Sequence, residues 1–133
     1  MHCHTLKRHA FFSKGTLLPT AILLAGALLS QQALAHAHLK TQTPAASSTV
    51  SAAPDKLTLE FTEGVEPAFS GVELALADNT AVATGKPQID GAANTRLIVP
   101  LAAPLAAGRY QVKWHVVSVD GHKTHGAYVF TVK

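Results

Sequence analysis

The chain has 133 residues, a formal charge of +3 and one cysteine. The excess positive charge belongs to the start of the sequence: Lys7, Arg8 and Lys14 precede residue 36, and the eight basic residues after them balance the eight acidic ones. With no Lys/Arg cluster beyond residue 35, the composition argues against a nucleic-acid partner or electrostatic binding to an acidic membrane. The length fits one domain, and a single cysteine excludes an internal disulfide.

Residues 1–35 show the order of segments that is typical of a secretory signal peptide. Basic residues come first, an apolar stretch follows at 17–29, and a small-x-small sequence ends at Ala35. The apolar stretch contains Pro19 and is shorter than the roughly 20 residues that span a bilayer, so a retained membrane helix is the weaker interpretation. We predict cleavage after Ala35, export to the periplasm, and a soluble, monomeric mature domain at residues 36–133.

Alternation of apolar and polar residues is the dominant pattern after residue 36, and it predicts β-strands. In chain order, the clearest of the predicted strands are 57–62, 72–76, 96–101, 110–119 and 127–132. Gly, Pro, Asn and Asp separate them, and no segment has a helical period, although the alanine-rich stretches 43–53 and 101–107 have room for a helical turn. Six or seven short strands with regular turns indicate a single all-β domain, an antiparallel, immunoglobulin-like β-sandwich.

The predicted strand 110–119 is apolar on both faces near its end, which is typical of a central strand. Trp114 and Val116 lie on one face, and Val117 and Val119 on the other. The strand leads directly into the sequence Asp120-Gly121-His122. We therefore expect that sequence to lie at the rim of the sandwich, where a core strand ends.

All five histidines after residue 35 lie near the two ends of the domain: His36, His38, His115, His122 and His125. After the predicted cleavage, His36 is the N-terminal residue, and its α-amine and imidazole Nδ1 together chelate a metal in a way that no internal histidine can. In an extended strand His36 and His38 face the same side. If the first and last strands meet, the two groups of histidines form one cluster.

Cu(II) prefers a tetragonal set of nitrogen and oxygen ligands, and His36, Asp120 and His122 supply an amine, two imidazoles and a carboxylate. Zinc accepts imidazole and carboxylate as well, but the amine chelate and the order of affinities favour copper. The only methionine and cysteine are Met1 and Cys3, and the absence of sulfur after cleavage argues against a Cu(I) site.

Several residues have a second interpretation. An amine followed by a histidine at the third position is itself a copper-binding arrangement, so His38 is either a rival ligand or a neighbour of the site. Asp120 is also a common turn residue, and His122 alone would read as a solvated loop histidine. His125 is a possible further ligand, and His115, next to Trp114 on its strand, is expected to be a surface residue.

The terminal His36, the strand sequence Leu-Thr-Leu-Glu-Phe-Thr-Glu at 57–63, and Trp-His-Val-Val-Ser-Val-Asp-Gly-His at 114–122 resemble the CopC family of periplasmic copper-binding proteins. The resemblance covers essentially all of residues 36–133. It implies a seven-stranded Greek-key β-sandwich that binds Cu(II) through His36, Asp120 and His122. It also implies that Glu63 lies close to the copper, as a glutamate does in some members.

The sequence departs from the family pattern in two places. Members that bind Cu(I) carry a methionine-rich loop, and the corresponding stretch 76–88 contains no methionine, so the chain resembles a Cu(II)-only member. Lys123 follows His122 where many relatives have proline, and His125 stands at a variable position.

Three functions fit these observations. The first is a carrier or buffer of copper in homeostasis or resistance that binds without turnover and passes copper to an inner-membrane permease. The second is a copper-dependent oxidative enzyme with an N-terminal histidine brace, which is disfavoured because the only tryptophan, Trp114, is predicted to face the core. The third is an immunoglobulin-like structural module with incidental histidines.

Overall fold

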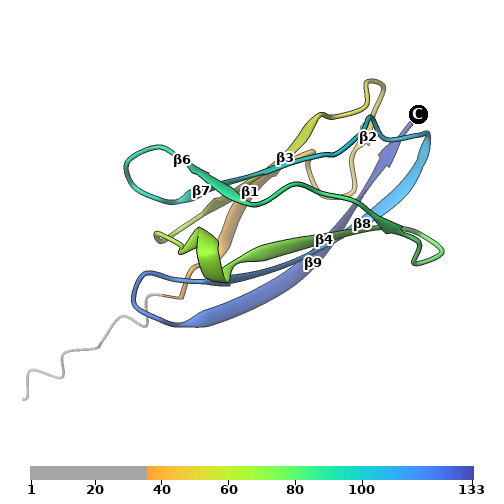
Figure 1. The fold of residues 1–133 in the computed structure, drawn as a ribbon. Coiled ribbons are helices and arrows are strands. Elements are labelled where there is room, and N and C mark those ends of the chain that lie inside the picture. Colours follow the sequence, from red (N-terminus) through yellow and green to blue (C-terminus); the bar gives the residue numbers. More distant parts are fainter. Residues whose placement is uncertain (1–35) are drawn as a thin grey trace, which may run out of the picture. The chain divides into compact units, whose positions relative to one another are not determined.

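Two β-sheets form the domain in the computed structural model, which describes residues 36–133 (Figure 1). The predicted signal peptide and the alternative of a retained membrane helix lie outside the described residues. Within residues 36–133, no helix is long and apolar enough to cross a membrane.

The first sheet has four strands, all paired antiparallel. Their spatial order is β1 (Leu39–Thr43), β3 (Lys56–Phe61), β7 (Arg96–Pro100) and β6 (Gln88–Asp90). The second sheet has five strands in the order β2 (Thr49–Val50), β9 (Lys123–Val132), β8 (Gly108–Val117), β4 (Gly71–Leu76) and β5 (Ala81–Val82).

The chain crosses repeatedly between the sheets, so neighbours such as β3 and β7, or β4 and β8, are not consecutive in sequence. This is the kind of crossover expected in a Greek-key sandwich. The predicted all-β sandwich is therefore confirmed. One pair departs from the antiparallel expectation: β2 runs parallel to β9, through Thr49 opposite Thr131 and Val50 opposite Val132.

The periodic pattern found the long strands and missed the short ones. It did not predict β1, β2, β5, β6 or the 3-10 helix at Pro67–Phe69. All but β1 have only two or three residues, and β1 has a single apolar residue, Leu39, so none of them shows an alternating pattern. The alanine-rich stretch 43–53 contains β2, and neither it nor 101–107 contains a helix.

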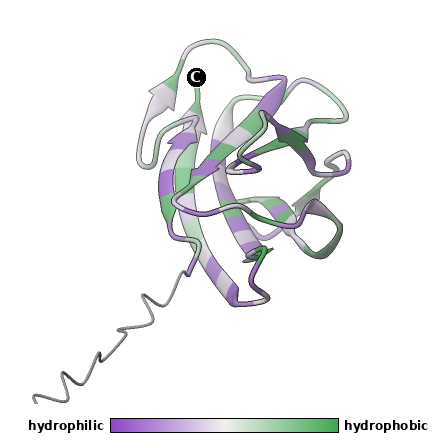
Figure 2. Cartoon of the chain, turned by 90° about the vertical axis from the view of Figure 1, so that its left-hand side faces the viewer, coloured by the Kyte–Doolittle hydropathy of each residue, from purple (hydrophilic) through white to green (hydrophobic). Residues whose placement is uncertain are grey.

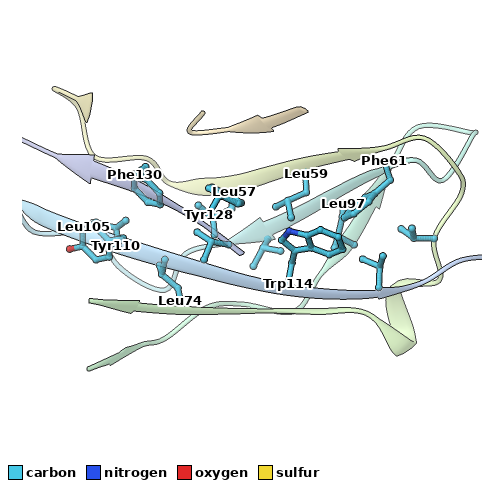
Figure 3. Packing of buried hydrophobic residues seen from close by; sticks show 14 of the residues in the cluster. Leu57, Leu59, Phe61, Leu74, Leu97, Leu105, Tyr110, Trp114, Tyr128 and Phe130 are labelled. Carbon is cyan, nitrogen blue, oxygen red and sulfur yellow. The ribbon is translucent and has the colours of Figure 1, made fainter. Parts of the chain in front are cut away.

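The core lies between the sheets and is built by strict alternation. Apolar residues of β8 and β9 face those of β3 and β7 (Figure 3). Aromatic rings pack both between the two sheets and between neighbouring strands of one sheet. Trp114 meets Phe61 edge-on with ring centroids 5.2 Å apart, and Tyr110 stacks on Phe130 at 5.5 Å. The alternation appears as bands of hydrophobic and hydrophilic colour along the strands (Figure 2). Trp114 is buried, as predicted.

The end of β8 differs from the prediction. The strand is central in its sheet, as expected, but it ends at Val117, and Val119 is 58% exposed. The inward position after Val116 is taken by Ser118, which is 1% exposed. Ser118 therefore continues the buried face of β8 by one position past the end of the strand, and the Asp-Gly-His sequence begins beyond it, at the rim.

Candidate metal centre

The N-terminal segment 36–38 is held in place by two threonines, one directly after β3 and the other on β9. The His38 N–H donates to Thr62 Oγ1 at 3.0 Å, and the Thr62 N–H donates to the His38 carbonyl at 2.9 Å. Thr124, on β9, donates its hydroxyl to the Ala37 carbonyl at 2.8 Å, and the Ala37 methyl group is fully buried. The start of the domain therefore lies beside the turn between β8 and β9 (Figure 1).

The turn between β8 and β9 is organised around Ser118. Its N–H donates to the His122 carbonyl at 2.8 Å, and the Gly121 N–H donates to the Ser118 carbonyl at 2.8 Å. Gly121 has φ of +89°, a left-handed conformation that favours glycine. The His122 N–H reaches the Ser118 hydroxyl at 3.2 Å. This network fixes the direction in which Asp120 and His122 project from the sandwich.

The Asp120 carboxylate is held by hydrogen bonds within this turn. It accepts a hydrogen bond from the Ser118 hydroxyl, and its Oδ2 lies 2.9 Å from His122 Nδ1. Ser118, and to a smaller extent His122, lowers the pKa of Asp120 from 3.8 to about 2. The carboxylate is therefore ionised at all but strongly acidic pH, and the stabilisation that it gives the folded turn is complete well above pH 3.8 and is lost as the pH falls from there through about 2.

The bond to Asp120 also decides which nitrogen of His122 is left for a ligand. A proton on Nδ1 would face the carboxylate oxygen 2.9 Å away, and in that tautomer the lone pair of the neutral ring lies on Nε2. A carboxylate that fixes the tautomer of a histidine in this way is a recurrent feature of metal sites. Both side chains are accessible, with exposures of 46% for His122 and 37% for Asp120.

The structure brings His36 to this turn from the other end of the domain. The rings of His36 and His122 have centroids 4.9 Å apart and are tilted by 35°. His38 follows on the same side, with its ring centroid 6.3 Å from that of His36. The extended N-terminal segment thus places both histidines on one face.

The side chains of His36, Asp120 and His122 contact one another in pairs, but they are not arranged around a common metal position. In residues 36–133, no group of three or more His, Cys, Asp or Glu side chains is arranged to hold a metal ion. Asp120 bonds to His122, and His122 lies against His36. Because Oδ2 of Asp120 lies 2.9 Å from His122 Nδ1, across the ring from Nε2, a metal bound by Asp120 and by His122 Nε2 together requires this contact to open and the side chains to rearrange around the ion.

In residues 36–133, the remaining candidates, Glu63 and His125, make no side-chain hydrogen bond or ion pair with these residues. Glu63 is exposed after Thr62, and the described part of the chain offers it no hydrogen bond or ion pair. His125 stands opposite His115 across the β8–β9 pair, and both are exposed. The ring of His115 lies over Gly71 of β4, consistent with the predicted surface role.

Three residues with a part in the site were missed by sequence reasoning: Thr62, Ser118 and Thr124. Ser118 carried a usable signal, because it continues the inward positions of Trp114 and Val116 and so had to be a buried serine in need of a partner. The sequence around Thr62 and Thr124 contains no comparable signal. Their contacts depend on how the N-terminal segment is placed against both sheets.

Fold and site together define a class of protein: a β-sandwich in which a histidine-bearing N-terminal segment meets an Asp-Gly-His turn at one rim. The CopC domain model matches residues 39–133, and the chain belongs to the CopC family. Protein YobA of Escherichia coli K12 is 48% identical over 111 residues, which cover 84% of this chain and 90% of YobA.

Two solved structures from this family have the same fold. The crystal structure of CopC from Methylosinus trichosporium OB3b has a TM-score of 0.69 at 34% identity and covers 74% of this chain and 94% of its own. PcoC, described as a methionine-rich copper resistance protein from Escherichia coli, has a TM-score of 0.67 at 36% identity, with coverage of 74% and 100%. The recognised family and the β-sandwich are thereby confirmed. The family match begins after His36 and His38.

Proposed function

We propose that the processed chain, beginning at His36, binds Cu(II) in the periplasm and serves as a copper carrier or buffer in homeostasis or resistance. The observation that carries this proposal is the approach of His36 to His122, with ring centroids 4.9 Å apart. Residues from the two ends of the domain meet at one exposed rim. The copper names of the relatives support the choice of metal.

The ligands in this proposal are the α-amine and Nδ1 of His36, Nε2 of His122 and a carboxylate oxygen of Asp120. Such nitrogen and oxygen donors suit Cu(II). Residues 36–133 contain no methionine or cysteine, in contrast to the methionine-rich PcoC. Because Cu(I) prefers sulfur ligands, we propose a site for Cu(II) alone. His38, Glu63 and His125 are outside this minimal set.

Transfer without turnover fits the exposure of the site. His122 and Asp120 are accessible at the rim, so an acceptor protein can approach the bound ion directly. We propose that an inner-membrane permease is that acceptor and that the protein acts as a monomer. The chemistry required of the chain is then limited to holding copper and releasing it.

Copper titration of the exported, purified protein in competition with a weak chelator tests this function. We expect one equivalent of Cu(II) to bind more tightly than to the chelator, with release of protons because the amine must be deprotonated. Zn(II) is expected to bind more weakly. Failure to compete would favour a structural module, and oxidative cleavage of chitin or cellulose by the copper-loaded protein with a reductant would favour an enzyme.

A further inference from the structure

A processed chain that begins His36-Ala37-His38 offers copper a second mode of binding, one that needs none of the fold. Cu(II) can take the terminal amine, the deprotonated amide nitrogens of residues 37 and 38, and the imidazole of His38. This four-nitrogen mode wraps the first three residues around the metal. It competes with the proposed site because both modes use the same amine.

In the structure, one amide needed for the four-nitrogen mode is already occupied. The His38 N–H donates to Thr62 Oγ1 at 3.0 Å, and the His38 carbonyl accepts from the Thr62 N–H at 2.9 Å. The Thr62 hydroxyl in turn lies 3.4 Å from the His36 carbonyl oxygen. These contacts continue the pairing of β1 with β3, in which Leu39 faces Phe61. Residue 38 is therefore held as a strand residue.

The middle residue is anchored to the other sheet. The Ala37 carbonyl accepts from the Thr124 hydroxyl of β9 at 2.8 Å, and its methyl group is 0% exposed within the core. To wrap residues 36–38 around copper, the chain must break both threonine contacts and withdraw Ala37 from the core. The free energy lost in each of these changes disfavours the four-nitrogen mode. A metal held between His36 and His122 requires none of them.

We propose that Thr62, supported by Thr124, determines how this protein coordinates copper by withholding the His38 amide from the metal. Thr62 is a positioning residue, because it contacts the backbone that would otherwise become a ligand. The inference rests on the proposed function in one respect, the cleavage that frees the amine of His36. It assigns His38 a place beside the site and outside the ligand set.

The test replaces the Thr62 hydroxyl with a methyl group. Thr62→Val keeps the β-branched shape that suits its position next to β3, and Thr62→Ser is the matched control that keeps the hydroxyl. Each protein is exported with its own leader, and its N-terminus at His36 is verified by mass spectrometry. Visible absorption and electron paramagnetic resonance spectra are then recorded with one equivalent of Cu(II).

We expect the wild-type and Thr62→Ser spectra to agree and to be unchanged by His38→Ala. The Thr62→Val protein is expected to show a shift of its absorption band to shorter wavelength, because amide nitrogens are stronger-field ligands than a carboxylate. That shift is expected to disappear in the Thr62→Val/His38→Ala double variant. In metal-free protein, hydrogen exchange at the His38 amide should be slow in the wild type and faster in Thr62→Val.

Two results would overturn the inference: a Thr62→Val spectrum identical to the wild type despite faster exchange, or a wild-type spectrum of the four-nitrogen type that His38→Ala abolishes. If Thr62→Val does not fold, Thr62→Ala, which also lacks the hydroxyl that accepts from the His38 N–H, takes its place with the same expectations. A wild-type protein that binds no Cu(II), beside a Thr62→Val protein that binds it through His38, would refute the proposed function and support the inference. If neither protein binds copper, both fail.

Discussion

Replacing His122 by alanine is expected to lower the affinity for Cu(II) by about a hundredfold or more, because even the loss of a residue that only orients a metal ligand costs 10–100-fold. The reason lies in the pairing of His122 with His36, whose rings are 4.9 Å apart. Without the second imidazole, copper retains only the terminal chelate of His36 and the Asp120 carboxylate. Competition titration with a chelator of known affinity measures the change.

The chain provides a matched control for this variant. His115 is also an exposed histidine of the β8–β9 pair, but its ring lies over Gly71 of β4. His115→Ala is expected to leave the copper affinity within a few-fold of wild type. If the two variants lost affinity equally, or if His122→Ala lost none, the assignment of His122 as a ligand would be wrong.

The largest effect on stability is expected from Gly126→Ala. Gly126 lies opposite Trp114 across the β8–β9 pair, and a Cβ atom there would come within 2.5 Å of Trp114 Cζ2. Trp114 is packed edge-on against Phe61 and has little room to move. Overpacking of this kind costs typically 1–3 kcal/mol. Urea denaturation measures the loss of stability. Thermal unfolding measures it as a lower midpoint temperature, by roughly 4–8 °C for each kcal/mol in a small domain.

A second glycine separates this steric effect from the general cost of changing glycine. A Cβ atom at Gly71 would come within 2.6 Å of His115 Cε1, but that ring is exposed and free to rotate away. Gly71→Ala is therefore expected to change stability little. The smaller ring in Gly126→Ala/Trp114→Phe should restore part of the stability. Equal destabilisation by the two alanine variants would show that contact with Trp114 is not the cause.

The sandwich could be predicted because, in its long strands, buried apolar residues alternate with polar residues along the sequence. Leu57, Leu59 and Phe61 alternate with polar residues, and each is almost completely buried. The two-residue strand β2 is too short to show alternation. Its parallel pairing with β9 depends on the position that the chain reaches after it crosses between the sheets. Short elements of this kind are determined by tertiary contacts rather than by local pattern.

The candidate site was predictable in part for a similar reason. His36, Asp120 and His122 stood out by chemistry and by their positions at the ends of the domain, and the structure places them next to one another at one rim. The contacts that hold them there were not predictable. Thr62, the residue directly after β3, and Thr124, on β9, both hydrogen-bond to the N-terminal segment. A threonine at such a position looks like any other polar strand residue.

The most direct test of the central claim compares copper binding by protein that begins at His36 with binding by protein that begins one residue earlier, at Ala35. Both retain every side chain of the site and differ only in whether the amine belongs to His36. We predict that the longer protein loses most of its affinity for Cu(II) while its unfolding temperature in the absence of metal stays the same. Equal, tight binding by both proteins would contradict the account.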